Sequence, residues 1–279
     1  MPVIDVRGAR VAYSAAGSGK TVLLLHSSAC SSAQWRTLGE MLQARYRVLA
    51  PDLYGYCQTD QRPGPASPGL SDAAALVNAV LTGETGRIHL VGHSYGGAVA
   101  LRCAADRPER LLSLTLIEPV AFHLLSHAPN LTAEHALFRE VADLAADVAR
   151  AAADGDGRRG MARFIDYWNG AGAWARLRPD LALQTAGVVL DFRDTMTDPA
   201  PIESLQRIAA PALVPRGSES PQPSRRIAAL LARILPNASL QTIEVAGHML
   251  PLIHAEAVNS AIVDHLSHRT AARRHPAAA

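Results

Sequence analysis

Cysteine is scarce in this sequence. Cys30, Cys57 and Cys103 lie far apart, are odd in number and show no C-x-x-C spacing. A disulfide framework needs paired cysteines and a structural zinc site needs closely spaced ones, so neither is expected, and we expect no metal ion. Unpaired thiols of this kind are typical of a reducing compartment. The sequence therefore predicts a cytoplasmic protein.

Charge is also sparse and nearly balanced. Charged residues make up 19% of the chain, the formal net charge is +2, and basic residues gather only in residues 268–275. Nucleic acids bind to concentrated positive charge, so we expect no nucleic-acid partner. Asp5 and Arg7 stand where a secretory signal would be apolar, and no apolar run reaches membrane-spanning length. We therefore expect neither export nor membrane insertion.

Hydrophobic residues, by contrast, are abundant, at 48% of 279 residues. This content supports a large core and excludes global disorder. Short apolar runs of strand type alternate with helical patterns. The strands are predicted at residues 3–6, 10–15, 22–25, 45–50, 87–91, 111–117, 212–214 and 240–245, and the helices at 32–43, 71–81, 95–105, 224–233 and 251–266. Apolar strands joined through helices predict an α/β fold with a mostly parallel central sheet and helices on both faces.

The alternation stops between Pro119 and Arg207, where no strand is predicted. This segment holds an alanine-rich helical run over residues 133–153 and a group of aromatic residues, Phe164, Tyr167, Trp168 and Trp174. So long an insertion between two core strands predicts a helical cap over the carboxyl edge of the sheet. We therefore predict a core at residues 1–118 and 208–268, a cap at 119–207 and a disordered tail at 269–279.

Two glycine-rich stretches need separate interpretations. In Gly92-His93-Ser94-Tyr95-Gly96-Gly97 a strand precedes and a helix follows, the context in which G-x-S-x-G exposes a nucleophile. Only residues without a Cβ fit at positions 92 and 96 of so tight a turn, and the amides of the new helix stabilise negative charge beside Ser94. We interpret Ser94 as a nucleophile; the alternative is a serine that only caps the helix.

Residues 17–21 resemble a phosphate-binding loop, but a strand follows where that loop must open a helix, so we reject nucleotide binding.

A serine nucleophile needs a base, an acid that orients the base, and donors for the oxyanion. His248, in Val245-Ala246-Gly247-His248, directly follows the last predicted strand at the same sheet edge as Ser94. We interpret His248 as the base. Cys30 and Cys57 are weaker alternatives to Ser94 as a nucleophile because neither occupies such a turn.

With this serine turn and this histidine, the chain resembles the α/β-hydrolase fold superfamily from residue 22 to residue 248. The resemblance implies a serine esterase-like enzyme without a cofactor. It also implies two backbone donors for the oxyanion, the amide of Tyr95 and the amide of Ser28 or Ser27. Members usually carry His-Gly at the start of the loop that follows the strand at residues 22–25, where this chain has His26-Ser27.

The acid has two candidates, Glu118 and Glu219. By the resemblance an aspartate follows the seventh strand, but in Gly217-Ser218-Glu219-Ser220-Pro221 that position is Ser220. Glu118 ends the strand at residues 111–117, where some haloalkane dehalogenases of similar fold, which use an aspartate nucleophile, place their acid. We favour Glu118 because a carboxylate at the end of an apolar strand needs a partner, and His248 is available.

Together these residues predict hydrolysis of a carboxylic ester or related small acyl compound through an acyl-enzyme on Ser94. Carbon–carbon bond hydrolysis, lactone opening and acyl transfer need the same three residues, and a non-catalytic small-molecule receptor is the alternative outside enzymes. The residues predicted to line the substrate pocket are His26, Tyr167, Trp168, Trp174 and Met249. The sequence leaves the oligomeric state open.

Overall fold

One sheet organises the part of the chain that the structure, a computed structural model, describes: residues 1–63, 69–127, 132–176 and 185–271. Within these residues eight strands lie in the order β1-β2-β4-β3-β5-β6-β7-β8. β2 pairs antiparallel with β1 and β4, and every other pairing is parallel. The strands are β1 (Val3–Val6), β2 (Ala9–Ala16), β3 (Lys20–Leu25), β4 (Tyr46–Pro51), β5 (Ile88–His93), β6 (Leu111–Ile117), β7 (Ala212–Gly217) and β8 (Ala238–Ile243).

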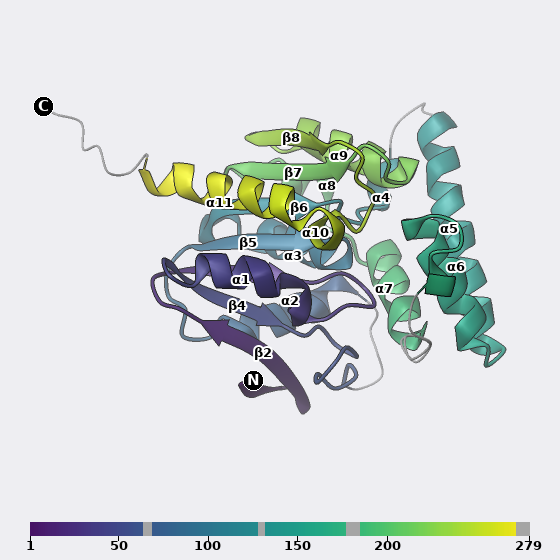
Figure 1. Cartoon of the computed structure of the whole chain (residues 1–279), viewed down its shortest axis with the longest axis horizontal. Helices are drawn as coiled ribbons and strands as arrows, with labels where there is room; N and C mark the ends of the chain where they lie inside the picture. Colours follow the sequence, from purple (N-terminus) through teal and green to yellow (C-terminus); the bar gives the residue numbers. More distant parts are fainter. Residues whose placement is uncertain (64–68, 128–131, 177–184, 272–279) are drawn as a thin grey trace, which may run out of the picture.

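Helices cover both faces of the sheet, as β3 illustrates. Successive side chains of a strand point to opposite faces. Val22 and Leu24 pack in the same apolar cluster as residues of α1 (Arg36–Leu42) and α11 (Ala255–Ala271), whereas Leu23 and Leu25 pack in the cluster that holds α2 (Leu70–Val80), α3 (Tyr95–Asp106) and α9 (Gln222–Ile234). Figure 1 shows α1 and α11 in front of the sheet. Each such buried side chain contributes about 1.5–3 kcal/mol of burial free energy. The predicted fold class is confirmed.

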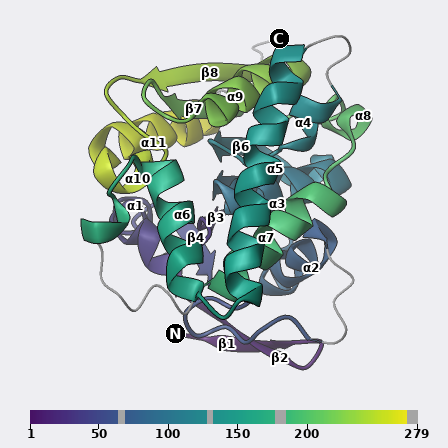
Figure 2. The same cartoon turned by 90° about the vertical axis from the view of Figure 1, so that its right-hand side faces the viewer.

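Between β6 and β7 the chain forms helices, which we call the helical insertion. They are α4 (His123–Ser126), α5 (Thr132–Ala153), α6 (Gly157–Asn169), the short 3-10 turn η3 (Trp174–Arg176), α7 (Thr185–Thr197) and α8 (Ile202–Leu205). In Figure 2 the helices α5, α6 and α7 stand in front of the sheet, across one end of its strands. The division of the chain into core, cap and tail stays a prediction.

Three aspartates, two on α7 and one directly after it, hold the helical insertion against the rest of the protein. Because residues three apart share one side of a helix, Asp191 and Asp194 face the same way, and Asp198 directly follows the last helical residue, Thr197. Their hydrogen-bond partners all belong to the core: Ser28 and Tyr56 for Asp191, Arg62 and Tyr95 for Asp194, and Ser71 and Arg102 for Asp198.

Two element boundaries near the carboxyl terminus differ from expectation. The helix predicted over residues 251–266 is interrupted at His254, which separates α10 (Leu250–Ile253) from α11. α11 then continues to Ala271, beyond the predicted end of this helix at residue 266, because its last residues include good helix formers. Residues 272–279 lie outside the described part. No helix among the described residues combines the length and apolarity needed to cross a membrane.

Candidate active site

The turn between β5 and α3 holds Ser94 in a conformation that few side chains adopt. Its backbone angles are φ 54° and ψ −116°, and the side chain remains 6% exposed. A Cβ on Gly92 would lie 2.3 Å from the carbonyl oxygen of Gly96, and a Cβ on Gly96 would lie 2.4 Å from that of His26. Both contacts are impossible, so the two glycines allow the strained turn that presents Ser94.

His248 connects Ser94 to Glu118 through both ring nitrogens. Its Nδ1 lies 2.6 Å from Glu118 Oε2, and its Nε2 lies 3.0 Å from Ser94 Oγ. Since the carboxylate accepts a hydrogen bond, Nδ1 carries the proton and Nε2 accepts from the serine hydroxyl. Burial of both partners, with Glu118 fully covered and His248 3% exposed, removes competing water from this line of contacts.

Of the two candidate acids, the structure brings Glu118 and not Glu219 to His248. Glu118 follows β6 with a positive φ of 42°, and its second oxygen accepts the amide of Gly217 at 2.7 Å. The side chain of Glu219 is exposed, while its amide donates to the carbonyl of Ala246. Ser220, at the position that the resemblance gives to the acid, is buried, and its hydroxyl has no hydrogen-bond partner within the described residues.

The loop after β3 distinguishes the two candidate oxyanion donors. The amide of Ser27 donates to Gln34 Oε1 at 3.1 Å, and the Ser27 hydroxyl donates to the same oxygen at 3.0 Å. This engagement leaves the amide of Ser28 as the candidate from this loop. The amide of Tyr95 is the first of α3 and has no partner within the helix, because the first four amides of any helix lack one.

Contrary to prediction, His26 lines neither of the pockets beside Ser94. It stabilises the loop after β3 instead. Its Nε2 accepts the amide of Leu53 at 2.9 Å, so its Nδ1 carries the proton and donates to the carbonyl of Ser27 at 2.7 Å. Complete burial lowers the pKa of His26 to about 4, which keeps the ring neutral. With both nitrogens engaged inside the core, His26 fixes the backbone that precedes Ser28.

A further histidine, His93, joins the loop after β3 to the loop that carries His248. Gln34 donates through Nε2 to His93 Nδ1 at 3.2 Å, so His93 Nε2 carries the proton and donates to the carbonyl of His248 at 2.9 Å. Burial holds the pKa of His93 well below its usual value, so this ring also stays neutral. Sequence reasoning missed both Gln34 and His93. The one available signal was a histidine at the variable position of the serine turn.

An apolar cavity of about 330 Å³ opens beside Ser94 and His248. Helix α6 contributes Phe164, Ile165 and Trp168, and the segment after β8 contributes Met249, Leu252 and Ile253. The Trp168 ring lies 4.4 Å from the imidazole of His248, measured between centroids. Of the residues predicted to line a substrate pocket, Trp168 and Met249 line this cavity, and exposed Leu252 and Ile253 bring it to the surface.

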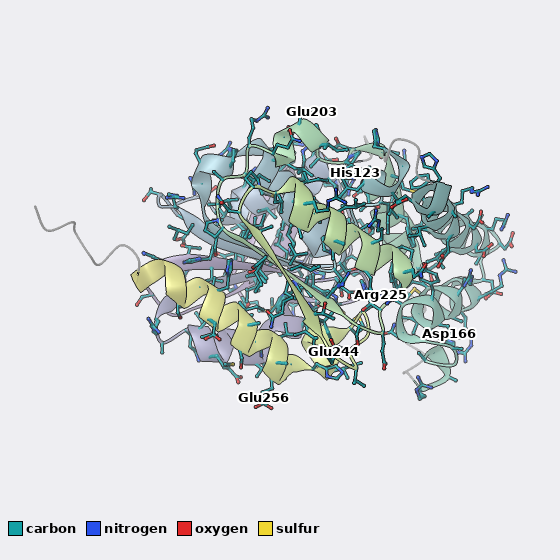
Figure 3. The ribbon with its side chains drawn as sticks, turned by 90° about the horizontal axis from the view of Figure 1, so that it is seen from above. His123, Asp166, Glu203, Arg225, Glu244 and Glu256 are labelled. Carbon is teal, nitrogen blue, oxygen red and sulfur yellow. The ribbon has the colours of Figure 1, made fainter. Side chains whose placement is uncertain are left out.

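Tyr167 and Trp174, also predicted to line the pocket, lie outside it. The Tyr167 hydroxyl donates to Glu140 at 2.6 Å, and the Trp174 amide donates to Asp166 at 2.7 Å while its ring faces the guanidinium of an exposed arginine. Figure 3 labels Asp166 at the end of the molecule formed by the insertion. Tyr167 lies outside the cavity because consecutive residues of a helix point about 100° apart, so Tyr167 cannot share the inward direction of Trp168.

A second and much smaller pocket adjoins Ser94 beneath α7. Its free space is about 10 Å³, and its polar lining residues are Ser28, Ser94, Tyr95, Asp191 and Thr195. The remaining walls are apolar, with Phe122, Phe164 and Phe192 among them. Sequence reasoning missed Asp191, since an aspartate on a helix gives no signal until the helix is packed against its neighbours.

Residues 22–261 match the sequence profile of the Alpha/beta hydrolase family. The chain belongs to this family. Over 121 residues it is 40% identical to the dihydrolipoyllysine-residue acetyltransferase component of the acetoin cleaving system of Cupriavidus necator, which covers 42% of this chain and 32% of that protein. Over 129 residues it is 33% identical to the 2-hydroxy-6-oxo-6-phenylhexa-2,4-dienoate hydrolase of Comamonas testosteroni, which covers 45% of each. The chain thus spans less than half the length of these two relatives.

Among solved structures, this α/β hydrolase is similar to a thermophilic esterase from Thermogutta terrifontis. The TM-score is 0.73 at 24% sequence identity, with 96% of this chain and 97% of the esterase covered. At this identity the likeness shows a shared fold.

Cysteine chemistry finds little support in the site of this α/β hydrolase. Cys30 borders the large cavity, but burial raises the pKa of its thiol and so disfavours the nucleophilic thiolate. Cys57 is exposed, and its thiol pKa is raised as well. In the described ranges no group of three histidine, cysteine or acidic side chains could hold a metal ion.

Proposed function

We propose that this α/β hydrolase cleaves a carboxylic ester or a related acyl compound through an acyl-enzyme on Ser94. The observation that carries the proposal is the buried line from Ser94 Oγ through His248 to Glu118, with contacts of 3.0 and 2.6 Å. This line ends beside an apolar cavity large enough for a small organic substrate.

In the first half of the reaction, Ser94 Oγ attacks the substrate carbonyl carbon while His248 Nε2 takes the hydroxyl proton. The amides of Ser28 and Tyr95 stabilise the negative charge that develops on the carbonyl oxygen. Glu118 stabilises the imidazolium, which then returns its proton to the leaving oxygen as the carbon–oxygen bond breaks. The products of this half are the free alcohol and an ester on Ser94.

In the second half, His248 takes a proton from a water molecule that attacks the acyl-enzyme. The same amides stabilise the second tetrahedral intermediate, and His248 returns the proton to Ser94 Oγ as the acid is released. The helical insertion covers Ser94 and the two pockets beside it, since Phe164 and Trp168 border both pockets. Their rings suit an apolar substrate portion.

Carbon–carbon bond hydrolysis is the second candidate. It is favoured by the 33% identity to the dienoate hydrolase of Comamonas testosteroni. The same serine, histidine and glutamate would act on a ketone instead of an ester, with a carbon leaving group that takes the proton. Product analysis with a 2-hydroxy-6-oxo-dienoate and with simple esters separates the two candidates.

The direct test is labelling with a fluorophosphonate probe and mapping of the modified residue by mass spectrometry. We expect the label on Ser94, together with hydrolysis of p-nitrophenyl butyrate that Ser94→Ala abolishes. Cys57→Ala is the control, because this exposed thiol takes no part in the proposed reaction. Full esterase activity in Ser94→Ala would refute the proposal. Absence of label in folded protein would favour a non-catalytic receptor.

A further inference from the structure

Asp191 is a buried carboxyl group that the proposed reaction does not use. It comes from α7 and lines the small pocket beside Ser94, where it retains 7% exposure. Ser28 Oγ and the Tyr56 hydroxyl both donate to the same oxygen, Oδ2, at 2.5 Å each. Within the described residues the other oxygen, Oδ1, has no hydrogen-bond partner, so Oδ1 is the oxygen available to the pocket.

The surroundings of Asp191 favour its neutral form. One turn further along α7, Asp194 accepts two hydrogen bonds from Arg62, including one at 3.0 Å, and a third from the Tyr95 hydroxyl at 2.8 Å. The two hydroxyl donors and the charge of Arg62 favour the ionised form of Asp191, whereas the negative charge of Asp194 opposes ionisation. Burial is the larger cause, and it raises the pKa of Asp191 to about 8. Tyr56 and Tyr95 stay protonated, because burial raises their pKa values as well.

The position of the proton follows from the hydrogen bonds. Two hydroxyl groups donate to Oδ2, so the proton of the neutral carboxyl group resides on Oδ1. Oδ1 is thus a hydrogen-bond donor at the pocket between Ser94 and Ser28. The free space of about 10 Å³ is on the order of what one water molecule, or one substrate oxygen, requires.

Resting on the proposed function, we propose that Asp191 donates a hydrogen bond from Oδ1 to an acceptor oxygen on the acyl part of the substrate, close to the scissile carbonyl. The substrate class is then acyl compounds with an ether, hydroxyl or oxo oxygen next to the carbonyl, in preference to plain alkyl acyl groups. The small pocket takes this oxygen, and the apolar cavity takes the larger remainder. A carbon at the same place would leave the donor unpaired, which is unfavourable in a buried site.

Two nearly isosteric esters test this assignment, p-nitrophenyl methoxyacetate and p-nitrophenyl butyrate, which differ by one oxygen in place of one methylene. The readout is the ratio of their kcat/KM values, divided by the ratio of their rates of alkaline hydrolysis to remove intrinsic reactivity. Wild type should prefer methoxyacetate about fivefold, as one net hydrogen bond implies. The catalytic steps at Ser94 and His248 are common to both esters and cancel in the ratio.

Variants of Asp191 distinguish a role in binding the substrate oxygen from a purely structural role. Asp191→Asn keeps an amide donor for the pocket and an oxygen for Ser28 and Tyr56, so it should retain the preference. Asp191→Leu removes the donor and should bring the ratio to about one. Asp198→Asn is the matched control, because Asp198 directly follows α7 but bonds to Ser71 and Arg102 and does not line the small pocket. Its ratio should equal that of wild type.

The pH dependence supplies an independent readout. The wild-type preference should be constant below pH 7 and decline above pH 8 as Oδ1 loses its proton, whereas the Asp191→Asn preference should not change. Equal ratios in wild type and Asp191→Leu, or a wild-type preference unchanged up to pH 9.5, would overturn the inference while leaving the serine hydrolase intact. Failure to hydrolyse either ester, with no labelling of Ser94, would overturn both.

Discussion

Glu118→Gln tests the proposal that the carboxylate after β6 is the acid that orients His248. Glutamine matches glutamate in size, so the substitution removes the negative charge and leaves the buried volume unchanged. Without that charge the imidazolium that His248 forms during catalysis has no counter-ion. The amide can also hold the ring in the wrong tautomer by donating to Nδ1.

The expected loss of kcat follows from the distance between the charges of Glu118 and His248 and from the burial of both groups. With 2.6 Å between Nδ1 and Oε2, the charge centres lie about 4 Å apart, where two unit charges attract by about 4 kcal/mol at an effective dielectric constant of about 20. That energy corresponds to about 10³-fold in kcat. KM should change little, since Glu118 is fully buried and does not line either pocket beside Ser94.

The assay is steady-state hydrolysis of p-nitrophenyl butyrate, with circular dichroism to show that the variant is folded. Glu219→Gln is the matched control and should keep wild-type kcat, because its side chain is exposed. Folded Glu118→Gln with more than a tenth of wild-type kcat would show that another group orients His248. Adding Ser220→Asp, at a buried position beside Gly217, should recover about tenfold of the lost activity if an acid can act from that loop.

Three further predictions concern stability. Gly96→Ala should cost at least about 3 kcal/mol in urea unfolding, because its Cβ would overlap two backbone carbonyls, whereas Gly86→Ala has open space and should cost less than about 1 kcal/mol. Asp194→Asn should cost about 3–5 kcal/mol in the same assay, because it leaves the buried guanidinium of Arg62 without its closest counter-charge; a loss below 1 kcal/mol would contradict this. Asp191 has a raised pKa, so the native state keeps a proton that the unfolded state has lost between about pH 4 and pH 8. The stability of wild type relative to Asp191→Asn should therefore fall as pH rises to 8 and be constant above it, as urea midpoints at pH 5, 7 and 9 would show.

Local sequence determined the serine turn and much of the sheet. Gly92 and Gly96 are required because a side chain at either position would overlap the turn itself or the end of the adjacent strand. The glycine spacing therefore identifies the turn from the sequence alone. The continuous apolar runs reveal strands buried on both faces, as in β3, because burial leaves no polar alternation. The placement of His248 followed from chain order, since parallel strands bring their carboxyl ends to one edge.

Only the tertiary structure decided which side chains meet at that edge. Glu118 and Glu219 both follow parallel strands, and the direction of each turn, not its position in the chain, brings one carboxylate to His248 and leaves the other in water. Trp168 and Tyr167 are neighbours in sequence, yet the rotation of α6 directs only Trp168 into the cavity. Asp191 reaches Ser28 across 163 positions of the chain. Such long-range contacts depend on how helices pack. The sequence alone therefore indicated the candidate nucleophile and base, and packing selected the carboxylate beside His248 and the side chains around the site.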